Sequence, residues 1–562
     1  MKISEIPVFL RTVRHIPPKQ IYHRVRLRTK RAYYLRFPNG LEERWAKDVP
    51  ETGSWPEDFV PIDWNVEHEA PRHTEFGRGE IHMVGEVHDV FAGGWRPQER
   101  SQLFRYHLHY FEWAWPMAKE GGQQNRDDFG TLWKSWRANT QVGRWDEWSP
   151  YVVSLRAWVL CGVFDSLVRG SEIEPDVLKV LQLSAQLLKN NLEKDVGGNH
   201  LLKNLKALVG LADFLKRNDF VKNSQMFDAE VARQVLQDGG HYELSPSYHA
   251  QVLADTCDVR DLVEASGHKI HSMDAIVESM VHWLDCITYP DATLPRFGDC
   301  VQPPAGLVEV LLARSNREAG RLPRLRVLAA SGYVIWAPSA TWMVVADLGQ
   351  AGPPELPAHI QSDWGSFELW DSGQLLIADP GTTSYVGERR AWERSSNSHN
   401  VPTPVDGDWA EVWSSFRVGG LFSASPIEVE GTPSAPTAKA RIRSWSARGA
   451  AWQLQREFTF DQSGFTVCDL NLGRKGYLCS VTCPASAAIA WSDCADNLPI
   501  MNDVVSVARS FGELEEAARF VWALPAFGCT TMTASLAGQL SRIDRRQWVL
   551  SVAGIAGAHQ NE

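Results

Sequence analysis

The residues best suited to chemistry lie in one short segment, Gly239 to His249, which reads GGHYELSPSYH. It places two histidines, two tyrosines and a glutamate around a double glycine and a proline. Imidazole and phenol groups are costly to bury without partners, and both can carry protons. Upstream, Gly197-Gly198 precedes Asn199 and His200, an amide and an imidazole at a predicted helix start. The two segments indicate an enzyme that moves protons on a carbon acid or a carboxylate.

A second set of candidate residues lies in the C-terminal half of the chain. His359 precedes a predicted strand, and a histidine in that position is either structural or a proton carrier. Asp379 and His399 are suitable ligands for a divalent metal, with Gln361 as a weaker oxygen ligand. A buried hydrogen bond between Asp379 and His399 explains these two residues equally well. From residue types alone, both interpretations stay open.

Composition excludes several classes of function. The 562 residues carry a net charge of −11, so the basic footprint of a nucleic-acid-binding protein is absent. Nine scattered cysteines without a Cys-x-x-Cys motif favour neither a disulfide framework nor a thiolate zinc site. The 24 tryptophans either fill a helical core or line a groove, where indole faces would stack on sugar rings. A groove of that kind would favour a carbohydrate ligand.

The N-terminus lacks the features of a secretory signal, because Glu5, Pro7 and Arg11 interrupt its apolar residues. No apolar stretch is long enough to be a transmembrane segment. A cytoplasmic location is therefore expected, with a periplasmic or cell-surface location as the alternative. The basic run from Arg11 to Arg31 predicts an amphipathic lead-in helix, which could also touch a membrane or a partner.

The elements that must position these residues fall into three regions. Residues 1–95 predict an irregular N-terminal arm, because proline-rich acidic sequence interrupts any regular period. Residues 96–328 predict successive helices over 149–168, 174–192, 199–216, 227–236, 249–265 and 273–286. Residues 329–562 contain short β-rich segments separated by glycine or proline. The sequence thus predicts a multidomain chain, with a helical bundle or α/α toroid followed by an antiparallel β-sandwich and a cleft between them.

Together these motifs resemble the heparinase II/III family of polysaccharide lyases, and in particular relatives found in bacterial surface-polysaccharide gene clusters. The segments that carry the resemblance are Gly198–Leu201, Asp238–His249, Phe297–Asp299, His359–Leu369, Asp379–Thr382 and Ser398–Asn400. Their order is similar to that of the family. The resemblance implies an N-terminal α/α toroid and a C-terminal antiparallel β-sandwich.

The resemblance also implies β-elimination at a uronic acid in an anionic polysaccharide, with a C4–C5 double bond in the product. Asn199 matches the amide that neutralises the uronate carboxylate, with His200 beside it. Tyr248 resembles the tyrosine that acts as base and as acid to the leaving oxygen, and His359 the second proton-transfer group. A tyrosine needs nearby cations or imidazoles to lower its pKa before it can act as a base.

Five further residues are predicted to contact the substrate or to assist the catalytic tyrosine. They lie beside the motifs or supply the cations that an anionic polymer requires, and they are His241, Glu243, His249, Lys203 and Arg394.

Two departures from the family pattern affect the site. Metal-bearing relatives read His-x-His-x-Asp where this chain has Gln361 in the position of the second histidine. A neutral amide is a poor zinc ligand, so no cofactor is required, although Gln361, Asp379 and His399 admit a structural divalent metal, zinc or calcium. Lys203 occupies the position of a glutamate found in some members, which suggests a more anionic or differently oriented substrate.

Three functional classes are compatible with these residues. The first is a lyase acting on a uronate-containing polysaccharide, in exopolysaccharide or capsule metabolism. The second is a non-catalytic glycan-binding or assembly factor, which would have no need of a proton relay. The third is a glycoside hydrolase, which needs two opposed carboxylates, and only Glu243 and Asp299 lie near the motifs. The sequence leaves the oligomeric state open.

Overall fold

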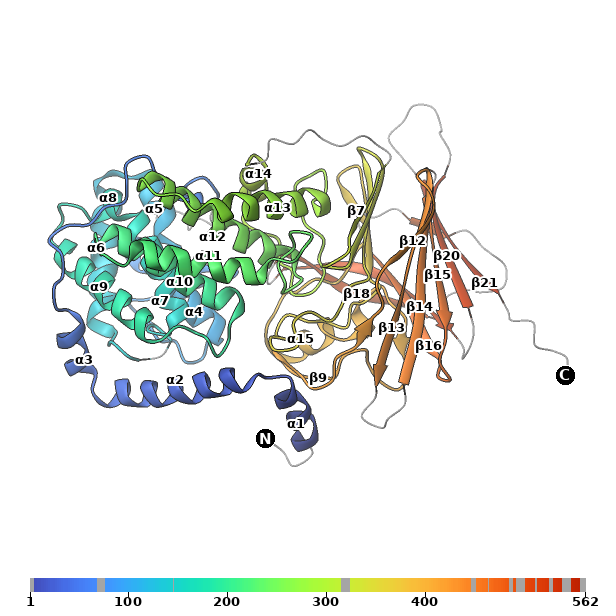
Figure 1. Cartoon of the computed structure of the whole chain (residues 1–562), viewed down its shortest axis with the longest axis horizontal. Coiled ribbons are helices and arrows are strands. Elements are labelled where there is room, and N and C mark those ends of the chain that lie inside the picture. Colours follow the sequence, from blue (N-terminus) through green and yellow to red (C-terminus); the bar gives the residue numbers. More distant parts are fainter. Residues whose placement is uncertain are drawn as a thin grey trace.

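The computed structural model shows a helical N-terminal domain beside stacked β-sheets (Figure 1). It describes residues 5–67, 76–144, 146–314, 324–445, 451–462, 464–484, 489–491, 501–510, 513–524, 529–537 and 547–555. Among these residues, no helix combines the length and the apolar character needed to cross a bilayer. The order of helices and strands confirms the predicted fold class.

The N-terminal arm is more helical than the irregular segment predicted for residues 1–95, and two of its helices overlap the basic run Arg11–Arg31, where a lead-in helix is predicted. It begins with three helices, α1 (Ile6–Arg14), α2 (Pro18–Arg36) and α3 (Pro38–Trp45). Proline occupies the first turn of each helix, where no hydrogen bond is lost, so these prolines start helices instead of breaking them. The rest of the arm is mainly irregular, with a hairpin of β1 (Glu80–Met83) and β2 (Glu86–Asp89).

The helical domain is built around α10, whose residues are almost all buried. Its neighbours include α7, α9, α11 and α12. The helices of the domain are α4 (Gln102–Tyr110), α5 (Ala114–Glu120), α6 (Gly122–Asn139), α7 (Pro150–Gly162), α8 (Phe164–Leu167), α9 (Glu174–Asn190), α10 (Gly198–Phe214), α11 (Phe220–Gln234), α12 (Pro246–Ala265), α13 (His271–Ile287) and α14 (Leu307–Leu312).

Tryptophans of the helical domain fill its core. Trp115, Trp133, Trp136 and Trp148 are all less than 2% exposed. They pack against aromatic and aliphatic neighbours and present no face to solvent. The alternative in which these indoles line a carbohydrate groove is therefore wrong for these four residues.

The β domain is layered. A five-stranded antiparallel sheet follows chain order, with β3 (Arg324–Leu328), β4 (Tyr333–Ser339), β5 (Trp342–Asp347), β6 (Phe367–Asp371) and β7 (Gln374–Ile377). The strands begin at residue 324, slightly before the predicted boundary at 329. The core between this sheet and a larger one includes Trp336, Phe367 and Phe458.

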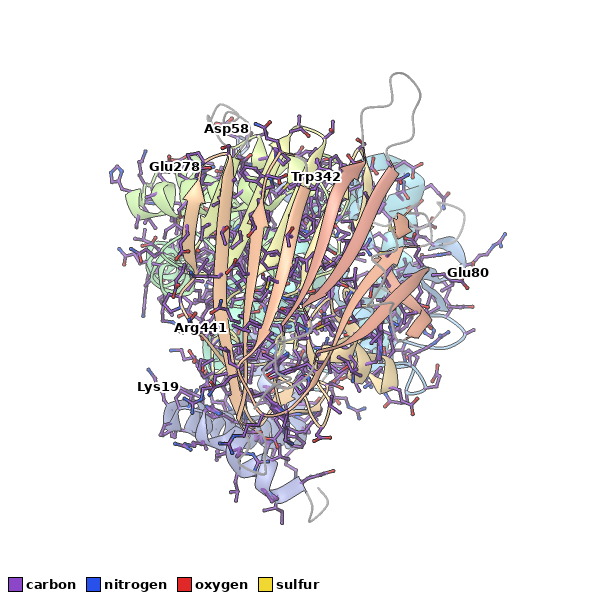
Figure 2. The ribbon with its side chains drawn as sticks, turned by 90° about the vertical axis from the view of Figure 1, so that its right-hand side faces the viewer. Lys19, Asp58, Glu80, Glu278, Trp342 and Arg441 are labelled. Carbon is purple, nitrogen blue, oxygen red and sulfur yellow. The ribbon has the colours of Figure 1, made fainter. Side chains whose placement is uncertain are left out.

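The larger sheet lies on the outer side of the domain, where Figure 2 shows its strands nearly side by side. Its strands are β11 (Ser423–Ala424), β12 (Glu428–Thr432), β13 (Ala435–Trp445), β14 (Ala451–Phe460), β15 (Gly464–Asn471), β20 (Cys529–Ala537), β21 (Gln547–Ile555) and β17 (Ile489–Trp491). A third sheet contains β18 (Met501–Ser510), β19 (Glu513–Leu524), β16 (Tyr477–Pro484) and β8 (Thr403–Pro404). Pairing is antiparallel except between β17 and β21.

Buried polar contacts fix the two domains to each other. Asp238 Oδ2 accepts hydrogen bonds from the backbone N–H and the hydroxyl of Ser331, at 2.7 and 2.9 Å. The indole N–H of Trp283 donates to the same hydroxyl at 2.9 Å. Tyr333 donates its hydroxyl to the carbonyl of Leu244 at 2.9 Å, which ties the β domain to the histidine- and tyrosine-rich segment. The joint therefore holds that segment in register with the first sheet.

Gly239 tests how tightly this joint is packed. Its φ is +91°, and a Cβ built there would lie 2.1 Å from the carbonyl oxygen of Ser279. We expect Gly239→Ala to lower the free energy of unfolding, measured in urea, more than Gly373→Ala does. Gly373 has the same φ of +91° but open space around it, so the difference of about 1–3 kcal/mol isolates the clash. Equal losses in the two variants would contradict the packing described.

Candidate active site

The site begins at the first turn of α10, where Asn199 meets Glu243. The backbone N–H and the side-chain amide of Asn199 each donate to one oxygen of Glu243, both at 2.8 Å. Gly198 permits this approach, because a Cβ there would lie 2.1 Å from Glu243 Oε1. Burial would raise the pKa of Glu243, but nearby imidazoles and the Asn199 hydrogen bonds bring it below its ordinary value. Glu243 is thus a buried carboxylate that fixes the Asn199 amide.

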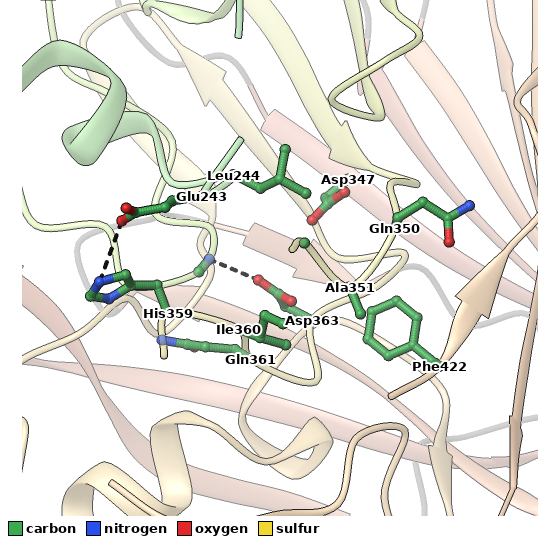
Figure 3. Close-up of a pocket in the computed structure, with 12 residues that line it drawn as sticks. Glu243, Leu244, Asp347, Gln350, Ala351, His359, Ile360, Gln361, Asp363 and Phe422 are labelled. Carbon is green, nitrogen blue, oxygen red and sulfur yellow. Dashed lines mark hydrogen bonds and ion pairs between the residues drawn. The ribbon is translucent and has the colours of Figure 1, made fainter. Parts of the chain in front are cut away.

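His359 connects this carboxylate to a second one. Its Nε2 lies 3.5 Å from Glu243 Oε2, and its Nδ1 lies 2.9 Å from Asp299 Oδ2 (Figure 3 shows the contact with Glu243). The side chain is 10% exposed, whereas both carboxylates are fully buried. Since Nδ1 makes the shorter contact, Nε2 is the nitrogen with more freedom to exchange a proton.

Asp299 is held by the β domain. Both terminal nitrogens of Arg390 donate to its two oxygens, the second contact at 2.6 Å. Gln361 Nε2 donates to Asp299 Oδ1 at 2.9 Å. Burial would raise the pKa of Asp299, but Arg390 and His359 lower it well below its ordinary value. Asp299 therefore stays charged and orients His359.

Tyr248 lies against the face of His359. The ring centroids are 4.1 Å apart, and the Tyr248 hydroxyl is 3.1 Å from the hydroxyl of Tyr385. Burial raises the pKa of Tyr248 well above its ordinary value, and Tyr385 and Asp299 raise it further. The expected lowering of the Tyr248 pKa by nearby cations or imidazoles is therefore not found. In this state the phenol is protonated.

His200 supplies a partly exposed imidazole next to Asn199. Its ring stacks on Tyr151 with centroids 4.3 Å apart, and Nδ1 lies 3.3 Å from Glu193 Oε1. Burial would lower the pKa of His200, but Glu193 raises it above its ordinary value overall. The side chain is 35% exposed, so an anionic ligand can reach a ring that favours positive charge.

A small open pocket lies at the domain joint and is lined by Glu243, His359 and Gln361 of the residues described above. Glu243 and His359 lie at one end, and Asp347, Gln350 and Phe422 at the other (Figure 3). The helical domain contributes the segment with Glu243, and the β domain contributes the loop with His359. The site therefore forms only where both domains meet.

Two of the predicted substrate contacts are interior hydrogen-bonding residues. His241 and His249 are each 1% exposed. His241 bonds to Gln234 at 2.9 Å, and His249 bonds to the carbonyl of Met280 at 2.9 Å. Burial lowers the pKa of His241 to about 4 and that of His249 to about 3, so both are neutral. The structure corrects the role predicted for them, because they hold the segment in place.

Lys203 and Arg394 are also corrected. Lys203 Nζ donates to Asp255 Oδ1 at 2.9 Å inside the helical domain, so its charge is already neutralised. Arg394 is 0% exposed and donates to backbone carbonyls, including that of Ile360. Burial lowers the pKa of Arg394 to about 10. It shapes the loop that carries His359 and has no exposed charge for a substrate.

The three predicted metal ligands do not form a ligand set. His399 Nδ1 bonds directly to Asp379 Oδ2 at 2.9 Å, and Gln361 turns its amide nitrogen toward Asp299. Gln361 Oε1 and His399 Nε2 are buried without a hydrogen-bond partner. Within the part of the chain that the structure describes, no group of three His, Cys, Asp or Glu side chains could hold a metal ion. The divalent metal stays a prediction.

The structure adds three residues to the predicted site. Asp299 lies in the Phe297–Asp299 motif, which the sequence links only to a hydrolase carboxylate, and Arg390 has no sequence signal that sets it apart from other cations. Tyr385 precedes α15 (Gly387–Glu393) and has no sequence signal of its own. Its hydroxyl contacts Tyr248, and the Arg390 guanidinium lies 5.1 Å from its ring centroid. Only the folded chain brings these residues together.

The fold and the site define a two-domain toroid–sandwich protein. Residues 72–311 match the family model described as Heparinase II/III N-terminus, and residues 320–533 match Heparinase II/III-like, C-terminal. The chain belongs to the heparinase II/III-like family.

The relatives that match this chain have low sequence identity to it. A heparin-sulfate lyase of Bacteroides stercoris is 24% identical over 399 residues, which are 60% of this chain and 59% of that protein. One from Pedobacter heparinus is 25% identical over 350 residues, 53% of this chain and 51% of that protein. The chain thus spans less than two thirds of the length of these relatives. A crystal structure of heparinase III matches with a TM-score of 0.63 and 16% identity, covering 84% of this chain and 85% of that one, and supports the fold.

The direct pair between Asp379 and His399 leads to a prediction about metal removal. Burial would lower the pKa of His399, but Asp379 raises it overall, so the contact favours the protonated form of His399. We expect a chelator to leave the unfolding temperature unchanged. Asp379→Asn should lower the free energy of unfolding by about 1–3 kcal/mol with or without the chelator. A fall in unfolding temperature that zinc or calcium reverses would instead establish a structural metal.

Proposed function

We propose that the protein is a polysaccharide lyase that cleaves a uronate-containing polymer by β-elimination. The observation that carries this proposal is the continuous cluster of Asn199, Glu243, His359 and Tyr248 at the domain joint. An amide, an imidazole and a phenol converge there, although they come from distant parts of the sequence. Heparin-sulfate lyases among the relatives support the same class of reaction.

The first requirement of this reaction is neutralisation of the uronate carboxylate, because its charge makes the proton on C5 weakly acidic. Asn199 has two amide hydrogens, and Glu243 accepts one of them. We assign the other to the substrate carboxylate, which must displace the groups that leave Asn199 only 2% exposed. His200 next to it favours the charged form and adds a second donor. Donors fixed in advance stabilise the enolate-like intermediate without reorganisation.

The second requirement is a base and an acid. We assign the base to the neutral form of His359, in which Nδ1–H is held by Asp299 and Nε2 takes the C5 proton, while the electron pair forms the C4–C5 double bond. The bond from C4 to the bridging oxygen breaks, and Tyr248 donates its proton to that oxygen. A phenol with a raised pKa is protonated before the reaction, which suits an acid. Proton exchange with solvent then restores both groups.

The geometry disfavours a glycoside hydrolase. That reaction needs one carboxylic acid and one free carboxylate on opposite sides of the scissile bond. Glu243 accepts from Asn199, Asp299 accepts from Arg390, and His359 lies between them. Both carboxylates have lowered pKa values, so neither is poised to donate a proton.

The substrate class follows from the donors of the site. A carboxylate-bearing sugar supplies the acidic C5 proton and the charge that Asn199 and His200 would bind. Lys203 and Arg394 offer no exposed cation for sulfate groups. We therefore propose a uronate polymer with carboxylate as its main charge, which suits a role in exopolysaccharide or capsule metabolism.

Ultraviolet absorbance of the C4–C5 double bond tests the proposal. Purified protein is incubated with glucuronan, alginate, hyaluronan, heparan sulfate and native capsule. We expect product from at least one polymer, and Tyr248→Phe and His359→Ala should each lower kcat by about 10²–10⁴-fold.

Tyr242→Phe is the matched control. The ring of Tyr242 packs edge to face against the ring of the buried His241, and the guanidinium of Arg233 lies over the Tyr242 ring. This variant should keep the activity of the unchanged protein. Full activity in both Tyr248→Phe and His359→Ala would remove these residues from the mechanism. No absorbance with any polymer, combined with measurable binding, would favour the non-catalytic glycan-binding factor.

A further inference from the structure

Several large apolar side chains of helix α2 point away from the protein. Of the 18 large hydrophobic side chains that are exposed among the described residues, eight lie between Ile6 and Phe37. Tyr22, Val25 and Leu35 are 64%, 60% and 51% exposed. Such a concentration in about thirty residues is a candidate interaction surface, because the other ten are spread over the rest of the described sequence.

The inner side of α2 is fixed to the helical domain. Positions 20, 23, 27 and 30 are half-buried and position 34 is buried, and they follow the three- and four-residue steps of one helix face. Arg24 donates to the carbonyl of Asp195 at 3.2 Å, and Lys30 donates to the carbonyl of Asn190 at 2.5 Å. Tyr34 is buried and bonds to Asn191. These contacts hold the outer face of α2 away from the helical domain.

The outer face of α2 carries an apolar stripe that is interrupted by the exposed Thr29 and Arg36 and has further cations at its edges. Ile21, Val25 and Ala32 follow one another on the outside of the helix, with Tyr22 and Tyr33 beside them. Arg26 and Lys19 flank this stripe on one side, and Arg28 on the other, all of them exposed. Figure 1 shows α2 along one edge of the molecule, and Figure 2 shows Lys19 at its periphery.

The charge of this segment opposes that of the whole chain. Between Glu5 and Glu42 there are nine Lys or Arg residues and no Asp or Glu, whereas the complete sequence has a net charge of −11. A helix with an apolar stripe bordered by Lys and Arg is suited to the interface of an anionic bilayer, where long cationic side chains reach the headgroups. In α1, which precedes α2 in the chain, Leu10 is 62% exposed.

We propose that the outer face of α2, together with Leu10 of α1, docks the protein on an anionic lipid surface. A hydrophilic polyanion would satisfy the cations but would leave Ile21, Val25 and Leu35 in water. A protein partner would be expected to contact a surface with few lysines, whereas this face has both lysine and arginine along its apolar stripe. α2 forms a convex surface at the edge of the molecule. A convex surface fits against a flat bilayer better than a groove would.

Vesicle sedimentation tests this proposal with the full chain. We expect binding to vesicles of phosphatidylcholine and phosphatidylglycerol (3:1) and much weaker binding to phosphatidylcholine alone. The double variant Tyr22→Ser/Val25→Ser should lower the partition coefficient at least tenfold, because burial of both side chains is lost. Arg26→Gln/Arg28→Gln should lower it about fivefold per cation removed. Val405→Ser, at a site 61% exposed in the β domain, should bind like the unchanged protein.

Three results would overturn the proposal. No binding to the phosphatidylglycerol vesicles is the first. Unchanged binding by the Tyr22/Val25 variant is the second, since it would reduce the effect to charge alone. The third is the absence of vesicle binding together with self-association, measured by light scattering, that these variants abolish. Binding to soluble dextran sulfate that the variants abolish, again without vesicle binding, would count in the same way. Circular dichroism confirms that the variants are folded, as expected for exposed positions.

Discussion

The site depends on a buried relay of charges that crosses the domain joint. Glu243 and Asp299 are carboxylates from the helical half, His359 lies between them, and Arg390 from the β domain neutralises Asp299. A buried carboxylate without a partner is strongly unfavourable, so each domain supplies what the other lacks. The positions of Asn199 and His359 follow from this constraint, because each bonds to one of the two carboxylates. The same interactions therefore stabilise the interface and align the groups assigned to the proposed elimination.

Most of the fold could be predicted from the sequence because its signals are local. The helical periods around α7, α9, α10 and α12 and the short β-rich segments each depend on nearby residues only. The N-terminal arm could not be predicted in the same way. A proline inside a helix disrupts it, whereas a proline in the first turn is tolerated and favours helix initiation. Only the positions of the helix boundaries of α1, α2 and α3 show that these prolines lie in first turns.

The site was predictable in its residue types and less so in their roles. Asn199, Tyr248 and His359 lie in one connected cluster, and only the family resemblance gives a reason to group them from the sequence. Lys203 resembles a substrate-binding cation until Asp255, 52 residues later, is placed opposite it. His249 resembles a proton carrier until the carbonyl of Met280 is found at its ring. Tyr385 has no signal at all, because its role comes entirely from a hydroxyl 137 residues away. Partners distant in sequence decide whether a polar residue is structural.

Placing one half of the site on each domain has a consequence for how such a gene can change. A substitution at Glu243 alters the environment of His359, which is encoded more than a hundred codons later. Recombination between distant homologues near the junction of the two domains would join a carboxylate from one lineage to an imidazole from another. The hybrid would keep both folds but lose the match between them. The two halves are therefore expected to be inherited together and to diverge in concert.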